Sequence, residues 1–338
     1  MKLRIHVDMV IRLCILLDRN KIDSNIEKEG VTMAYNVTVV GSLNMDIHIP
    51  VAHIPLQGET LSLLKPSSQA AGGKGANQAV AAQRLGASVH FIGSVGDDDA
   101  GKLLRNKCQN EGIDISGIRI LNDANTGQAF IMLEPDGHNT IMVEGGANKL
   151  GSVEAVNADR VNIQRSQITI AQLETNLEPV IAAFRLAKQV DRLTILNPAP
   201  ALPELPEELI QLTDVITPNE TEAATLTGQK VETEADCQKA AARFQEMGIA
   251  NVVIRLGSNG VFYSVNGRSR LVPAHKVTPV DTTAAGDTFI GAIAAKVVPD
   301  LSNMDETIEF ANLASSLTVQ KEGAMDSIPE LREVNEVK

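Results

Sequence analysis

Short apolar segments alternate with helical segments along most of this chain of 338 residues. Strands are predicted at 37–40, 89–92, 168–173, 194–196, 215–216 and 252–256, and helices at 76–85, 98–110, 177–189, 220–227, 234–247 and 288–298. Strands that are separated by helices pair in parallel, because the helix supplies the crossover between them. The alternation therefore predicts a three-layer α/β domain of the Rossmann type, with a central, mainly parallel sheet and helices on both faces.

Two regions interrupt this alternation. Residues 47–64 contain strand-like residues with proline and glycine turn signals, and residues 126–145 contain two apolar runs around a Pro-Asp-Gly turn at 135–137. Neither region can bury its apolar side chains alone. We expect them to form a small β-sheet that projects from the domain as a lid over a site.

The first 34 residues precede the first predicted strand, and we expect them to lie outside the domain, which we place at 35–332. Their apolar stretch at 9–17 is interrupted by Arg12 and is too short to span a bilayer. Their acidic residues do not suit a transit peptide, and no signal-peptide cleavage pattern follows the apolar stretch. Two explanations of these 34 residues are favoured over a targeting segment: a start codon assigned too far upstream, and a short amphipathic accessory helix.

The balance of charge limits the partners of the chain. It carries 42 acidic and 30 basic residues, a formal net charge of −12, whereas nucleic acids and anionic membranes bind basic surfaces. Three widely separated cysteines fit a reducing compartment, and six scattered histidines argue against a zinc site. We therefore expect a cytoplasmic protein that binds neither nucleic acid nor membrane.

The segment 281–287, Asp-Thr-Thr-Ala-Ala-Gly-Asp, carries the strongest chemical signal. It leads into the predicted helix 288–298, and small residues at a helix start leave the unpaired amides open to an anion. A carboxylate at Asp287 would stand beside a bound phosphoryl group and accept a proton from a hydroxyl. A simple helix cap is the alternative interpretation.

A second glycine-rich segment, Ala-Gly-Gly-Lys-Gly-Ala-Asn-Gln at 71–78, precedes another predicted helix. Its glycines allow the backbone to approach a ligand, and Lys74 and Asn77 add a charge and an amide. The segment is not a Walker A loop, because Gly75 rather than Ser or Thr follows Lys74. The dinucleotide fingerprint is missing after the first strand, which argues against an NAD-dependent oxidoreductase. An ordinary strand-to-helix turn is the alternative for this loop.

Together with further runs, these two segments resemble the PfkB family of carbohydrate kinases, in particular its ribokinase branch. The further runs are GSLNMD at 41–46, QLE at 172–174, LNPAP at 196–200, TPNETE at 217–222 and LGSNG at 256–260. All follow the order of the family between about residues 36 and 329. The resemblance implies a ribokinase-like fold, ATP-dependent phosphorylation of D-ribose at its 5-hydroxyl, and a β lid that covers the sugar and joins a homodimer.

The resemblance also implies a role for each matching residue. The sugar would contact Asn44, Asp46, Gly73, Lys74, Asn77, Glu174 and Asp287. Asp287 would be the general base, beside an anion hole built from the amides of Ala285 and Gly286. The nucleotide would contact Asn219, Glu222, Arg255, Leu256, Gly257, Ser258, Gly260, Gly286 and Asn312, and Glu222 would organise Mg²⁺ through water. Arg255 departs from the small residue expected at its position.

A monovalent cation, usually K⁺ in this family, is implied beside the anion hole. Its ligands would be Asp281, Thr283, Thr318, Lys321, Gly323 and Ser327, mostly through backbone carbonyls.

Other functions remain open. A kinase of this family can instead act on 2-deoxyribose, another pentose or a nucleoside, although the amide of Asn44 suits a 2-hydroxyl better than an apolar side chain would. A non-catalytic sugar-binding regulator would not need Asn219, Glu222, Gly286 and Asp287 together.

Overall fold

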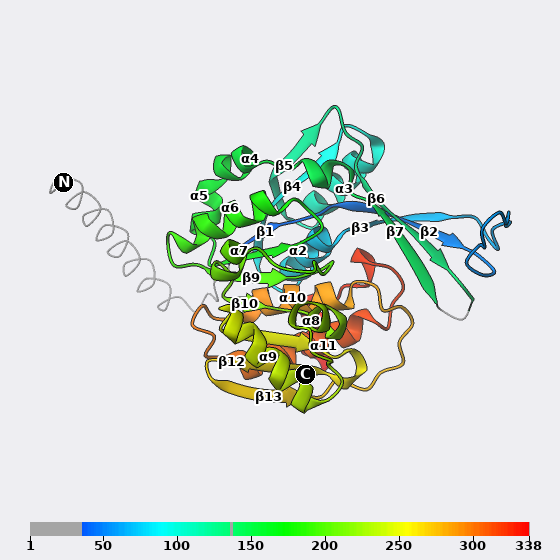
Figure 1. Ribbon diagram of the computed structural model, residues 1–338. Helices are drawn as coiled ribbons and strands as arrows, with labels where there is room; N and C mark the ends of the chain where they lie inside the picture. Colours follow the sequence, from blue (N-terminus) through cyan, green and yellow to red (C-terminus); the bar gives the residue numbers. More distant parts are fainter. Residues whose placement is uncertain (1–35, 136–137, 338) are drawn as a thin grey trace. The chain divides into compact units, whose positions relative to one another are not determined.

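The computed structural model describes residues 36–135 and 138–337 (Figure 1). The described residues fall in the contact unit 35–338. The predicted N-terminal extension, residues 1–34, lies outside the described residues, as do Asp136 and Gly137 of the predicted turn. In the described ranges, no helix has both the length and the apolar character needed to cross a bilayer.

A nine-stranded sheet forms the centre of the described part of the chain, in the order β13-β12-β11-β10-β9-β8-β1-β4-β5. Its parallel strands are β1 (Asn36–Val40), β4 (Ser88–Gly96), β5 (Asp114–Leu121), β8 (Ile168–Gln172), β9 (Leu193–Asn197), β10 (Val215–Ile216) and β11 (Asn251–Arg255). Antiparallel strands β12 (Val261–Val265) and β13 (Arg268–Val272) complete one edge. The predicted mainly parallel α/β fold is confirmed, although β5, β12 and β13 were not predicted.

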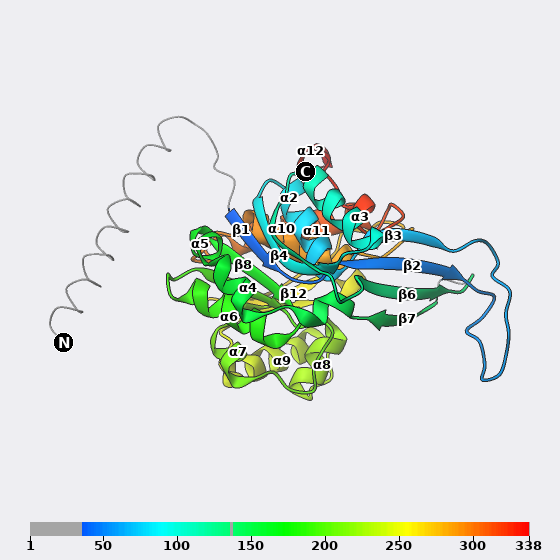
Figure 2. The same cartoon turned by 90° about the horizontal axis from the view of Figure 1, so that it is seen from above.

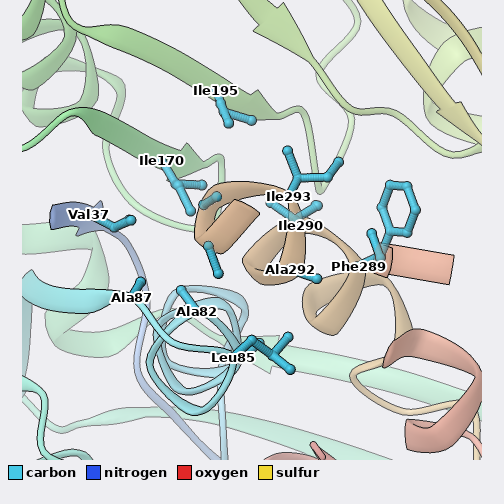
Figure 3. Packing of buried hydrophobic residues seen from close by; sticks show 14 of the residues in the cluster. Val37, Ala82, Leu85, Ala87, Ile170, Ile195, Phe289, Ile290, Ala292 and Ile293 are labelled. Carbon is cyan, nitrogen blue, oxygen red and sulfur yellow. The ribbon is translucent and has the colours of Figure 1, made fainter. Parts of the chain in front are cut away.

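Helices cover both faces of this sheet. On one face, side chains of α2 (Lys74–Arg84), α3 (Asp99–Asn110), α10 (Ala285–Lys296), α11 (Met304–Thr318) and α12 (Leu331–Val337) form a buried cluster with strand residues. Figure 3 shows part of this cluster, with labelled residues of α2 and α10 facing Val37, Ile170 and Ile195 of the sheet. The other face is covered by α4 (Val153–Ala158), α5 (Arg160–Arg165), α6 (Leu177–Lys188), α7 (Glu207–Gln211), α8 (Glu220–Thr227) and α9 (Glu234–Met247). Apolar burial on both faces is what central parallel strands require.

Helices α2 and α10 pack at close range. A Cβ atom on Gly291 of α10 would lie 2.5 Å from the Cβ of Ala81 and 2.7 Å from the carbonyl oxygen of Gln78. Only a glycine fits this contact, which brings the first turns of the two helices together. Those turns carry Asn77 and Asp287.

A separate sheet, with four strands in the described residues, extends away from the domain (Figures 1 and 2). Its order is β3-β2-β6-β7, with strands β2 (Asn44–Pro50), β3 (Ser68–Gly72), β6 (Gly127–Leu133) and β7 (Asn139–Glu144), and the 3₁₀ helix η1 (Gly146–Leu150) follows it. Only residues 41–43 separate β1 from β2, so the base of this lid adjoins the end of the main sheet. The first lid segment was predicted at 47–64, but its strands begin at Asn44 and end at Gly72. The second of them, β3, was missed because it lacks apolar alternation and is defined by pairing with β2.

Candidate active site

The predicted site residues gather at the carboxyl ends of the parallel strands. β1, β8, β10 and β11 end there, and α2, α8 and α10 begin there. In open parallel sheets this edge is where ligands bind.

Asp287 lies in the first turn of α10, and both of its carboxylate oxygens accept hydrogen bonds from α2. Asn77 Nδ2 donates to Oδ2 and Gln78 Nε2 donates to Oδ1, each at 3.0 Å. At the end of β8, Gln172 Nε2 donates to Gln78 Oε1 at 2.6 Å. Gln78 and Gln172 are fully buried, so this chain of amides holds the carboxylate in one orientation.

No role was predicted for Gln78 or Gln172. Both stand inside quoted motifs, which was the available signal. Their side chains come from positions 94 residues apart, so the contact between them could not be foreseen from either motif.

The start of α10 is open to an anion. Its N-cap is Ala284, with φ +59°, and no side chain of the described residues caps the helix there. Gly286 in the first turn has no side chain to cover the amides. The Ala285 N–H donates to the Thr282 carbonyl at 3.3 Å, but the next N–H groups of this first turn have no intrahelical acceptor. They and the positive end of the helix dipole suit an anion.

Glu174 joins several of the residues predicted to bind sugar. Its Oε2 accepts hydrogen bonds from Ser42 Oγ at 2.5 Å, from the Lys74 amide at 3.2 Å and from Asn44 Nδ2 at 3.5 Å. Asn148, which was not predicted, donates from Nδ2 to Asn44 Oδ1 at 2.8 Å. The Asn44 amide is thus held from both sides.

Asp46 is a buried carboxylate on the lid strand β2, only 7% exposed. Burial, with the nearby negative charges of Glu174 and Asp287, raises its pKa to about 7, against the opposing effect of Lys74. Burial alone would lower the pKa of Lys74, but the carboxylates of Asp287 and Glu174 outweigh it and the pKa is raised. A Cβ on Gly72 would lie 2.1 Å from Asp46 Oδ2, so this packing requires glycine.

Among the described residues, two buried side-chain oxygens of this network accept no hydrogen bond: Gln172 Oε1 and, next to Asp287, Asn77 Oδ1. An unpaired buried acceptor is costly. A ligand hydroxyl would satisfy Asn77 Oδ1, which fits a polyol bound beside Asp287.

On the other side of the α10 start, Asn219 and Glu222 form a capping box at the start of α8. Glu222 N donates to Asn219 Oδ1 at 2.7 Å, and Asn219 N donates to Glu222 Oε2 at 2.9 Å. Arg255 Nη2 donates to the same Glu222 oxygen at 3.1 Å, and its Nε donates to the carbonyl of Thr217 at 3.3 Å. A structural role of Asn219 as a cap therefore coexists with any ligand role.

Comparisons with known proteins agree with this geometry. The family described as pfkB family carbohydrate kinase matches residues 34–331. The chain belongs to this family.

Several relatives of this pfkB kinase have ribokinase in their names. A ribokinase from Staphylococcus aureus is 43% identical over 305 residues, which cover 90% of this chain and 100% of that protein. The bifunctional ribokinase/ribose-5-phosphate isomerase A of Fructilactobacillus sanfranciscensis is 45% identical over 293 residues, 87% of this chain but only 54% of that longer protein. A structure of Arabidopsis thaliana ribokinase complexed with ribose and ATP has a TM-score of 0.84 and 33% identity, covering 90% of this chain and 99% of that chain.

The predicted nucleotide loop of this pfkB kinase follows β11. Gly257 and Ser258 are exposed in the 3₁₀ helix η2 (Gly257–Asn259), whereas Leu256 and Gly260 are buried. Gly260 has φ +99°, and a Cβ there would lie 2.0 Å from the carbonyl oxygen of Val272, so the loop depends on glycine. Separately, Asn312 Nδ2 donates to the carbonyl of Pro273 at 3.3 Å and holds that segment against α11.

Asp281 organises the predicted cation loop of the family. Its Oδ1 accepts from Thr283 N at 2.8 Å and from Thr283 Oγ1 at 2.6 Å, and its Oδ2 accepts from Gly323 N at 3.0 Å. Burial raises the pKa of Asp281, but these hydrogen bonds outweigh burial and keep the pKa below its usual value. The side chains of Thr318, Lys321 and Ser327 bond elsewhere, to Thr288, Glu333 and Ala324. The side chain of Lys321 is itself a cation, so only its backbone carbonyl could contact another cation.

Proposed function

We propose that this pfkB kinase transfers a phosphoryl group from ATP to O5 of D-ribose, giving D-ribose 5-phosphate. The observation that supports this best is the convergence of Asp287, Asn77 and Lys74 beside the uncapped start of α10. Ribose is favoured as the acceptor because the relatives at 43% and 45% identity carry ribokinase in their names.

In the proposed reaction, O5 attacks the γ-phosphorus, the bond from that phosphorus to the β–γ bridging oxygen breaks, and ADP leaves. The proton of the 5-hydroxyl passes to the carboxylate of Asp287. Asn77 and Gln78 hold this carboxylate in place, so its acceptor oxygen points in a fixed direction. The amides of Ala285 and Gly286 would stabilise the charge that develops on the transferred group.

The proposal includes Mg²⁺ and a monovalent cation. Mg²⁺ supplies neutralisation of phosphate charge when bound, and it commonly keeps several waters. In the described residues no cluster of three or more His, Cys, Asp or Glu side chains could hold a metal ion, so Glu222 would act through water. For K⁺, the loop closed by Asp281, Thr283 and Gly323 offers oxygen ligands, which suit such an ion.

A homodimer formed through the lid and a cytoplasmic location also belong to the proposal. β7 is an edge strand of the lid and carries Ile141, Met142 and Val143, which are 53%, 49% and 56% exposed. An apolar sheet edge of this kind favours pairing with a second copy. Light scattering on the purified protein measures the oligomeric state. Cys108 and Cys237 are free buried thiols, as a reducing compartment permits.

A coupled assay of ADP release across ribose, 2-deoxyribose, other pentoses and nucleosides tests the function. We expect ribose to give the highest kcat/KM and ³¹P NMR to show a 5-phosphate. A clear preference for another acceptor would reassign the substrate within the family. Ribose binding without any phosphoryl transfer would support the regulator instead.

A further inference from the structure

Arg255 stands where its sequence position gave no reason to expect a charge. It is the last residue of β11, and its side chain is 16% exposed. A Cβ atom on Gly286 would lie 2.1 Å from Arg255 Nη1. The guanidinium therefore lies directly against the first turn of α10, at the proposed anion hole.

The hydrogen bonds of Arg255 fix which edge of the guanidinium faces that turn. In the described structure, Nε donates to Thr217 and Nη2 donates to Glu222. These two contacts leave Nη1 over Gly286. Nη1 carries two N–H donors, so the side chain can keep both protein contacts and still donate to an anion.

The ion pair with Glu222 explains how the positive charge of Arg255 is tolerated in this partly buried position. The two side chains are only 16% and 12% exposed, and the N–O distance is 3.1 Å. A partly buried guanidinium needs a paired carboxylate. Glu222 is itself fixed by the capping box with Asn219, so the arginine is held by a rigid partner.

We propose that Arg255 is a catalytic residue that contacts the transferred phosphoryl group through Nη1. This inference rests on the proposed kinase function. While the γ-phosphoryl passes from the bridging oxygen of ATP to O5, negative charge spreads over its equatorial oxygens. Arg255 exchanges no atom or proton with it; the planar guanidinium donates hydrogen bonds and supplies positive charge.

The test compares the wild type with Arg255→Gln, Arg255→Lys and a matched control, Arg243→Gln. Arg243 forms an ion pair with Glu246 at 2.9 Å, but on an exposed helix face. For each protein, kcat and both KM values are measured. Calorimetry then gives the affinity for ADP alone and for ADP with ribose and fluoroaluminate, which mimics the group in transfer.

For Arg255→Gln we expect kcat to fall by about 10²- to 10³-fold. Affinity for the fluoroaluminate complex should fall by a similar factor, while affinity for ADP alone changes by less than about threefold. Arg255→Lys should recover only part of the loss, because lysine keeps the charge but not the planar fork. Arg243→Gln should match the wild type.

A double variant separates direct contact from positioning of Glu222. If Arg255 acted only by orienting Glu222, adding Arg255→Gln to Glu222→Gln would change nothing further, and the proposal would be wrong. We expect the fluoroaluminate affinity of Glu222→Gln to fall again when Arg255 is also changed. If the wild type phosphorylates ribose and the Arg255→Gln variant keeps a normal kcat, this inference alone is wrong. A wild type that phosphorylates no sugar overturns the proposed function and this inference with it.

Discussion

Among single residues, Asp287 has the most sharply defined surroundings, since each of its carboxylate oxygens accepts one side-chain amide. Asp287→Asn keeps the size of the side chain but removes its ability to accept a proton. We expect kcat to fall by at least about 10²-fold while ribose affinity, measured by calorimetry, changes little. The exposed Asp300→Asn serves as a control. Near-normal turnover of Asp287→Asn would exclude the general-base role.

Asn44 offers a test of the sugar. Its amide lies between Glu174 and Asn148, and Asn44→Met would leave sugar hydroxyls unpaired in a buried site. The expected loss of ribose binding is roughly 1–3 kcal/mol, or about 5- to 150-fold. A sugar lacking the 2-hydroxyl should lose much less.

The measurement is the ratio of kcat/KM for ribose over 2-deoxyribose in the wild type and in Asn44→Met. This ratio is its own control, because a general disturbance of the site affects both sugars. An unchanged ratio would mean that Asn44 does not distinguish the 2-hydroxyl.

Asp46 predicts how stability depends on pH. Its pKa is about 7 in the folded protein and near 3.8 when exposed, so the folded state binds the extra proton between these values. The free energy of unfolding of the ligand-free protein should therefore fall as pH rises from about 4 to about 7, by at most about 4 kcal/mol from this group. Urea unfolding of the wild type and Asp46→Asn checks this. The difference between the two proteins should change with pH, and a constant difference would contradict the assignment.

The site residues that could be predicted from the sequence differ from those that could not in how distinctive their local sequence is. Asn77 and Asp287 occur in runs whose residue types already indicate chemistry. Asn148 and Gln172 act through partners far along the chain, and a lone buried amide has no distinctive sequence signal. Arg255 was predicted to contact the nucleotide and was noted as a departure from the expected small residue, but the sequence does not show which helix start its side chain reaches.

At the scale of elements, helices with clear caps were predicted well. The predicted helices 220–227 and 234–247 coincide with α8 and α9, each of which starts at a capping box. β3 and β13 were not predicted, because both carry mostly polar or small residues and their strand geometry comes from antiparallel partners. Their existence depends on tertiary pairing rather than on local preference.

The close contact of α2 with α10 gives a prediction for a pair of elements. Gly291→Ala would press a methyl group against Ala81 and the backbone of α2. We expect a loss of about 1–3 kcal/mol in the free energy of unfolding, as for other overpacked cores. Because the helices carry Asn77 and Asp287, kcat should also fall, by about 10- to 100-fold.

Ile163→Val is the control for destabilisation alone. Ile163 is fully buried in the cluster on the opposite face of the sheet, and its truncation typically costs about 0.5–1.5 kcal/mol. Chemical unfolding of both variants measures the loss of stability, and steady-state kinetics measures whether kcat falls more in Gly291→Ala than in Ile163→Val. If Gly291→Ala kept wild-type kcat, the helix contact would not set the geometry of the site.

For the whole molecule, the family match begins at residue 34 and all the site residues lie beyond it. We expect a chain that starts at Met33 to keep its cooperative thermal unfolding and its kcat for ribose within about twofold. The comparison is with the full-length protein, prepared in the same way. Loss of folded protein or of activity on truncation would show that residues 1–32 contribute to the domain.

The order of the strands has a consequence for how the protein is made. β1, the first strand of the main sheet, lies between β4 and β8, and Asn77 bonds to an aspartate 210 residues further along. Such long-range pairings form slowly, and a ribosome delivers the chain from its N-terminus. A nascent chain that ends before α10 lacks Asp287, the proposed proton acceptor. Under the proposed mechanism, translation must therefore reach the last quarter of the sequence before any phosphoryl transfer can begin.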